Sequence, residues 1–95
     1  DMVLLLKLTT NIVEPSGKSV KTGEAARSLA ISADGSTMFV VNFKSNTMSK
    51  VRTSDMKVLE TIKACNEPIG VTYDAPTGNT WVACYKGQIK IYSNN

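Results

Sequence analysis

Short apolar runs alternate with clusters of turn-forming residues along most of the chain. The run at 38–43 (MFVVNF), for example, lies between the turn residues at 33–36 and those at 44–46. No segment repeats apolar residues at i, i+3 and i+4 over the roughly ten residues that a helix needs. The pattern therefore predicts an all-β chain. The expected strands are 4–8, 19–22, 28–32, 38–43, 47–52, 58–63, 69–73, 80–85 and 88–92.

The sequence repeats itself when it is shifted by 42 residues. Phe39 then falls on Trp81, and Phe43 falls on Tyr85. No gap is needed from residue 20 to residue 44, and one deletion at Gly87 aligns the next strands. A period of about 40–45 residues is typical of the four-stranded blades of a β-propeller.

The repeat predicts a β-propeller fragment of about two and a quarter four-stranded blades, with the strand order c-d, a-b-c-d, a-b-c. Residues 1–23 form a partial blade (strands c and d), residues 24–65 a complete blade, and residues 66–95 a partial blade (strands a, b and c). All three parts belong to one incomplete propeller domain.

Strands that are apolar on both faces belong inside a stack of sheets. The predicted inter-blade core consists of Leu29, Ile31, Phe39, Val41, Val71, Trp81 and Ala83. A blade needs a neighbour on each side. We therefore expect the remaining blades of the same protein, or adjoining chains, to complete the stack. A ring of identical copies is disfavoured because it would place two c strands in succession.

The repeated segments resemble the YVTN-type β-propeller repeat. The likeness lies in residues 28–35 (SLAISADG), 38–43 (MFVVNF) and 45–47 (SNT), and again in 68–71 (PIGV) and 81–85 (WVACY). Cys84 stands where the family usually has Asn. The resemblance implies a seven- or eight-bladed bacterial or archaeal toroid, exported to the periplasm or cell surface. Relatives of similar architecture include lactonase-like enzymes and quinoprotein dehydrogenase subunits.

Charge and hydropathy restrict the partners. Eleven Lys and Arg against eight Asp and Glu leave a net charge of +3, but the basic residues are scattered singly. Such a distribution is typical of a solvated surface, so no nucleic-acid partner is predicted. The longest apolar run, at 2–6, is far shorter than the roughly 20 residues of a membrane span. No targeting signal is recognised.

The residues needed for catalysis or metal binding are scarce. The chain has no His, and its two cysteines are 19 residues apart, so we predict no catalytic residue, no metal site and no cofactor. Cys65 and Cys84 are either two buried thiols or a disulfide between consecutive blades, because both fall near the same rim.

That rim, formed by the d–a and b–c connections, is the predicted ligand-binding face. Its candidate contacts are Arg27, Lys44, Asn46, Asn66, Glu67 and Lys86. Arg27 has two interpretations, a residue facing the central channel or a solvated or carbonyl-bonded residue where its strand begins.

The favoured function is a non-catalytic scaffold for a protein or glycan ligand on an exported bacterial protein. One alternative is a slice of a propeller enzyme (lactonase-like or quinoprotein dehydrogenase-like) whose active site lies mostly outside this chain. Another is a self-contained all-β domain.

Overall fold

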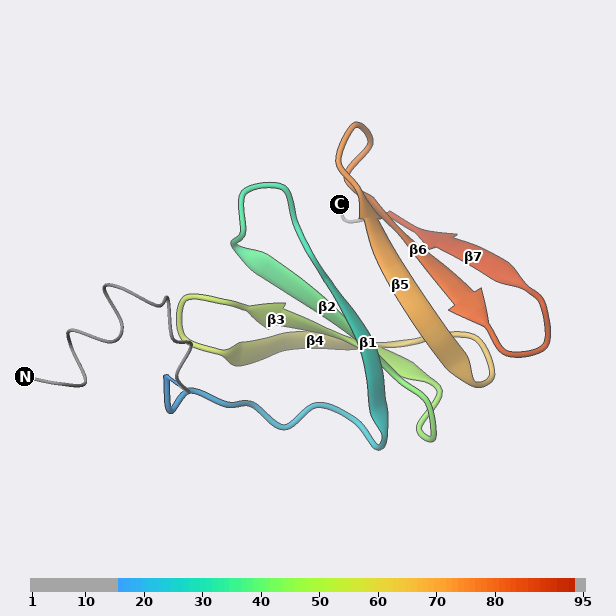
Figure 1. The fold of residues 1–95 in the computed structure, drawn as a ribbon, viewed down its shortest axis with the longest axis horizontal. Coiled ribbons are helices and arrows are strands. Elements are labelled where there is room, and N and C mark those ends of the chain that lie inside the picture. Colours follow the sequence, from blue (N-terminus) through green and yellow to red (C-terminus); the bar gives the residue numbers. More distant parts are fainter. Residues whose placement is uncertain (1–15, 94–95) are drawn as a thin grey trace, which may run out of the picture.

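The computed structural model describes residues 16–93, which contain seven β-strands and no helix (Figure 1). The strands are β1 (Ala26–Ile31), β2 (Thr37–Asn42), β3 (Thr47–Arg52), β4 (Lys57–Lys63), β5 (Pro68–Asp74), β6 (Asn79–Cys84) and β7 (Ile89–Tyr92). Each of them matches a predicted strand to within two residues at either end. The all-β prediction is therefore confirmed.

The strands form two antiparallel meanders. One sheet has the order β1-β2-β3-β4, and the other has the order β5-β6-β7. Within each sheet, every strand is hydrogen-bonded to the next one along the chain because the turns between them are short. These are the strand orders a-b-c-d and a-b-c of the predicted complete blade and the partial blade after it. We refer to them as blade 1 and blade 2.

The register of the two sheets repeats with the 42-residue period. Leu29 pairs with Val40 in blade 1, and Val71 pairs with Val82 in blade 2. Both first strands carry a bulge at the same place, between Ala26 and Ser28 and between Pro68 and Gly70. In the next pair of strands the offset falls to 41, since Val41 pairs with Met48 and Ala83 with Ile89. The single deletion inferred at Gly87 accounts for this change.

The predictions for the first partial blade fare differently. The strand predicted at 4–8 lies outside the described residues. The strand predicted at 19–22 is absent, since these residues have no ladder partner within 16–93. Thr22 is held instead by a side-chain hydrogen bond, its hydroxyl donating to Asn42 Oδ1 at 2.9 Å. A strand requires a ladder partner, and the partner predicted for 19–22, the strand at 4–8, is not among the described residues.

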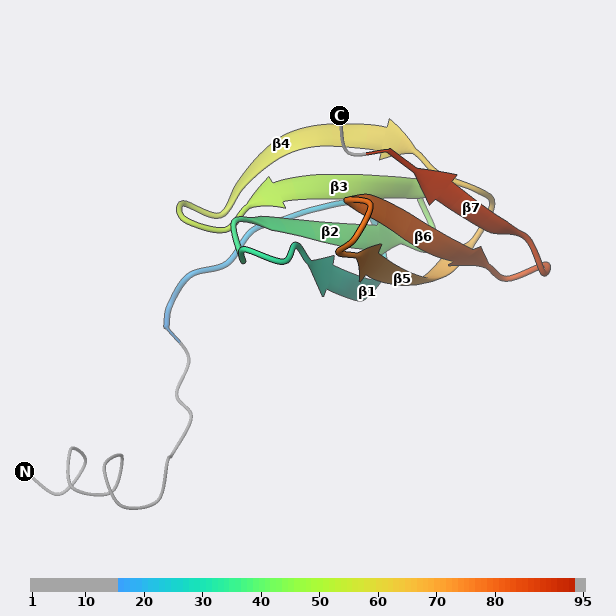
Figure 2. The same ribbon diagram turned by 90° about the horizontal axis from the view of Figure 1, so that it is seen from above.

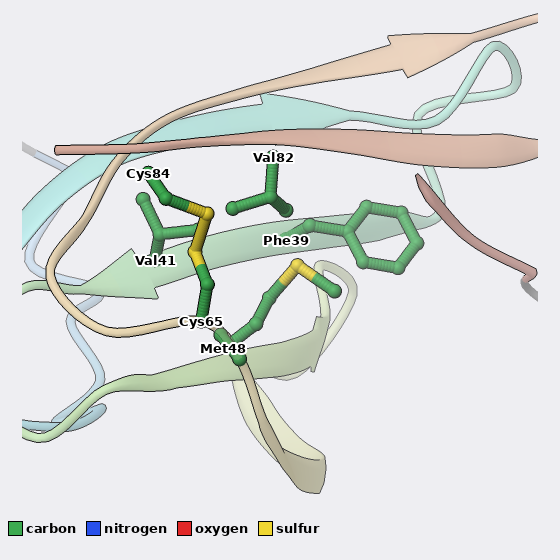
Figure 3. Close-up of a cluster of buried hydrophobic side chains, with 7 residues drawn as sticks. Phe39, Val41, Met48, Cys65, Val82 and Cys84 are labelled. Carbon is green, nitrogen blue, oxygen red and sulfur yellow. A yellow bond between two sulfur atoms is a disulfide. The ribbon is translucent and has the colours of Figure 1, made fainter. Parts of the chain in front are cut away.

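The two sheets pack face to face. β1 and β2 both contact β5, and Figure 2 shows the two meanders stacked against each other with β1 and β5 at the same edge. The buried core between them contains Phe39, Val41, Met48, Val82 and the two cysteines (Figure 3). The Phe39 and Tyr73 rings stack across the interface with centroids 6.0 Å apart. This interface fixes the position of one blade relative to the other.

The predicted inter-blade residues divide between two kinds of surface. Phe39 and Val41 are buried between the sheets, and Val71 packs against them. By contrast, Leu29, Ile31 and Trp81 are 54%, 50% and 41% exposed, so residues 16–93 do not bury them in an inter-blade core. The reason is their direction. Their positions in the ladders place Leu29 and Ile31 on the face of blade 1 turned away from blade 2, and Trp81 and Ala83 on the opposite outer face.

Candidate functional site

The connections at one end of the two blades form a shared surface, which we call the rim. It consists of the segments 23–25 and 64–67, which lead into β1 and β5, the bulge residue Arg27, and the turns 43–46 and 85–88, which follow β2 and β6. Both leading segments are held alike: the Phe43 N–H donates to the Ala25 carbonyl and the Tyr85 N–H to the Glu67 carbonyl, each at 2.9 Å. Ala25 and Glu67 also share a left-handed backbone, with φ of 56° and 54°. The rim therefore repeats with the blades.

Arg27 occupies the bulge of β1, where one extra residue interrupts the register. A bulge re-aims the side chain that it carries. Here the guanidinium carbon of Arg27 lies 4.8 Å from the centroid of the Phe43 ring, a cation–π contact. The residue is exposed on the innermost strand, and it caps an aromatic ring. Both interpretations of Arg27, a residue facing the central channel or a solvated residue where its strand begins, remain predictions.

Phe43 also contacts the next blade. Its ring meets Tyr85 edge to face, with centroids 6.5 Å apart and planes at 85°. Tyr85 is 65% exposed. Arg27, Phe43 and Tyr85 thus form a cluster that bridges the two blades, which we call the rim cluster. Neither aromatic residue was among the predicted site residues, because the predicted strands ended one residue too late and absorbed both rings.

Asn46 has a structural role. Its backbone is left-handed (φ 58°), and its side-chain oxygen accepts a hydrogen bond from the Glu67 N–H at 2.8 Å. Its backbone carbonyl accepts from the Ala64 N–H at 2.9 Å. The turn of blade 1 therefore holds the start of blade 2, and the Asn46 carboxamide oxygen is already engaged.

Beneath the rim, the two blades use different chemistry at equivalent positions. In blade 2, Cys65 and Cys84 form a disulfide with their Cα atoms 6.1 Å apart. Of the two interpretations of the cysteines, the structure has the disulfide. The equivalent pair in blade 1 is Gly23 and Asn42, and a Cβ built on Gly23 would lie 2.8 Å from the Asn42 Cβ. The chain positions that approach each other in blade 1 are therefore covalently joined in blade 2.

Asn42 is fully buried, yet all of its polar atoms are satisfied. Its nitrogen donates to the hydroxyls of Thr47 and Ser49, each at 3.1 Å, while its oxygen accepts from Thr22. A buried amide is tolerated only when its hydrogen bonds are made. This network ties the segment before β1 to strands β2 and β3.

The remaining candidate side chains surround the rim cluster. Lys44, Asn66 and Lys86 are exposed, and Glu67 is half-buried. Each lysine directly follows a ring of the cluster, so the repeat presents an aromatic–lysine pair in both blades. Within residues 16–93 no carboxylate pairs with Arg27, Lys44 or Lys86, and the ion pair of that range joins Arg52 to Asp55 at the other end of blade 1.

The opposite end of the blades is built from tight turns. Between β1 and β2, the Asp34 carboxylate accepts hydrogen bonds from the Ser36 N–H and from the Ser32 and Ser36 hydroxyls. These bonds favour the ionised form and lower the pKa of Asp34 to about 2. The carboxylate therefore closes the turn in its ionised form.

Two other features bear on ligand chemistry. A cavity of about 150 Å³ lies between the outer strands of the blades, lined by residues that include Lys50, Glu60 and Tyr92. Burial there raises the pKa of the Tyr92 hydroxyl. In the described part of the chain, no three His, Cys, Asp or Glu residues gather where they could hold a metal ion. Residues 16–93 also contain no helix long and apolar enough to cross a membrane.

No protein-family model and no curated protein matches the chain. Solved structures do match its fold. One is Kuenenia stuttgartiensis hydrazine synthase, at a TM-score of 0.66 and 25% sequence identity; the match covers 70% of this chain and 20% of that chain. The chain thus spans about a fifth of the length of this structural relative. The likeness and the repeated register identify the fold as consecutive blades of a β-propeller.

Proposed function

We propose that the chain is a segment of a larger propeller of the YVTN-repeat type that serves as a non-catalytic binding scaffold. The rim cluster carries this proposal. Its three side chains come from two blades, and two of them are exposed. Tyr and Arg are enriched where proteins bind their partners, and a rim can vary without disturbing the stack beneath it.

The two outer faces support the proposal that more blades belong to the assembly. Trp81 and Phe39 are equivalent in the repeat, as their paired partners Thr72 and Ala30 are. Phe39 is covered by blade 2, whereas Trp81 lies on an apolar outer surface with Ala83 and Ile89. A face of this composition fits the inner surface of another blade.

The proposed location is the periplasm or cell surface of a bacterium. The disulfide between Cys65 and Cys84 supports it, because structural disulfides form and persist in oxidising compartments. The sequence likeness at 28–35 and 38–43 supports the same location through the family it resembles.

Peptide and glycan arrays, probed with the protein that carries this chain, test the scaffold function. We expect saturable binding that falls about tenfold in Tyr85→Ala, while Lys57→Ala at the opposite end binds as the wild type does. Hydrolysis of lactones or oxidation of amines, lost in the rim variant, would contradict the proposal and favour a propeller enzyme.

A further inference from the structure

We infer that the rim cluster is a docking site for an acidic peptide segment of a partner protein, with Arg27 as the carboxylate-binding residue. The inference rests on the proposed scaffold function and names the chemistry of its ligand. It depends on the way in which the bulge of β1, the two rings and the neighbouring lysines are combined.

The first step concerns the guanidinium of Arg27. It lies over the Phe43 ring at 4.8 Å, and it pairs with no carboxylate of residues 16–93. A cation–π contact uses no N–H group of the guanidinium, so the planar fork of N–H groups still has donors for a ligand. That fork matches a carboxylate bidentately. Because the ring already restricts the side chain, binding costs little additional ordering.

The second step concerns the apolar part of the site. Tyr85 is 65% exposed, and its ring meets the Phe43 ring edge to face. A rigid, amphipathic ring beside a cation is a typical anchor for an apolar side chain in a protein interface. The expected ligand therefore carries an Asp or Glu close to an aliphatic or aromatic residue.

The third step decides between a peptide and a polyanionic glycan. Lys44 and Lys86 add positive charge, but Glu24 and Glu67 lie on the same rim. Each blade thus contributes a lysine and a glutamate side chain to the rim, next to an aromatic ring. Those carboxylates repel a chain that is negative at every unit, whereas a peptide with one or two carboxylates avoids them.

The test is a selection from a phage-displayed random peptide library with the protein that carries this chain. We expect the selected peptides to share an Asp or Glu near an apolar residue. Synthetic copies should bind roughly ten- to a hundredfold more weakly to Arg27→Gln, since a charge-assisted, bidentate contact is lost. Arg27→Lys should fall between the two, because it keeps the charge without the fork.

Lys57→Gln is the matched control, since it removes the same charge from an exposed position at the opposite end. Tyr85→Ser should weaken binding about tenfold, and circular dichroism checks the fold of each variant. If peptides bind but Arg27→Gln and Lys57→Gln behave alike, the inference fails while the scaffold function stands. The inference also fails if only a polyuronate oligosaccharide binds. If neither peptide nor glycan binds, the scaffold function fails with it.

Discussion

Blades 1 and 2 connect the end of the second strand to the segment before the first strand by different types of bond. Asn42 in blade 1 and Cys84 in blade 2 occupy equivalent positions at the end of the second strand, each facing the segment that leads into its blade. Asn42 makes that connection through one hydrogen bond from the Thr22 hydroxyl, and its amide nitrogen donates to two hydroxyls of β3. Cys84 makes the connection through a covalent bond to Cys65. The comparison teaches that the repeat conserves a contact between two chain positions, while the type of bond is free to change.

The same comparison extends to the faces of the blades. Phe39 and Trp81 have equivalent positions, but Phe39 is 3% exposed and Trp81 is 41% exposed. We therefore expect Phe39→Ala to cost about 3–5 kcal/mol of unfolding free energy. Trp81→Ala should cost roughly 1 kcal/mol in the 95-residue chain, because less of the ring is buried. Urea unfolding of both variants measures this difference. Equal losses of unfolding free energy would contradict the claim that blade 2 covers Phe39 while the face around Trp81 is open.

The disulfide is expected to have the next largest effect. It closes a loop between residues 19 positions apart, for which chain entropy predicts a stabilisation of about 3 kcal/mol. The double variant Cys65→Ser, Cys84→Ser should therefore unfold at lower urea than the wild type. Adding a reductant to the wild type should reproduce the loss and leave the double variant unchanged. If the reductant leaves the urea midpoint of the wild type unchanged, the disulfide does not stabilise the two blades.

Asn42→Ala should cost about 2 kcal/mol, less than the disulfide. The change leaves the Thr47 and Ser49 hydroxyls without their donor and the Thr22 hydroxyl without its acceptor. Thermal unfolding measures the loss, with Ser54→Ala in the exposed turn between β3 and β4 as a control. If Asn42→Ala is as stable as the control, the hydrogen-bonded clamp of blade 1 contributes nothing.

The smallest effect is expected in the turns at the opposite end. Three hydrogen bonds hold the pKa of Asp34 at about 2, below its ordinary value of 3.8. Because the folded state favours the ionised form, its stabilisation is complete above about pH 4 and is lost as the pH falls through 2. Asp34→Asn should therefore flatten the acid branch of the stability curve over that range.

Asp74→Asn, in the corresponding turn of blade 2, is the control. Its carboxylate accepts a hydrogen bond from the Thr77 hydroxyl. Acid titration followed by circular dichroism gives both curves. If the two variants show the same dependence of stability on pH, the three hydrogen bonds of Asp34 contribute no extra acid sensitivity to the turn of blade 1.

The regular part of the fold could be predicted from the sequence because it depends on periodic patterns. The 42-residue shift placed Phe39 on Trp81, and the sheets have the register that this shift requires. Even the deletion at Gly87 corresponds to the change of offset between the second and third strands. Alternation and turn residues determine which residues pair, so these features can be recognised along the chain.

The site depended on local geometry that no periodic pattern encodes. Arg27 reaches the Phe43 ring because a bulge changes its direction, and nothing in the residues 26–28 signals a bulge. Phe43 and Tyr85 reach the rim because their strands end one residue earlier than predicted. Asn46, a predicted ligand contact, has a left-handed backbone, and its carboxamide oxygen accepts a hydrogen bond from the Glu67 N–H of the next blade. Strand ends and backbone irregularities decide such contacts.

Sedimentation of the 95-residue chain over a range of concentrations tests the central claim most directly. If the two blades are consecutive parts of a larger stack, the apolar outer faces around Leu29 and Trp81 should drive association that increases with concentration. Acrylamide quenching of Trp81, the single Trp of the chain, should decrease as the association proceeds. A monomer at all concentrations that melts cooperatively would contradict the account.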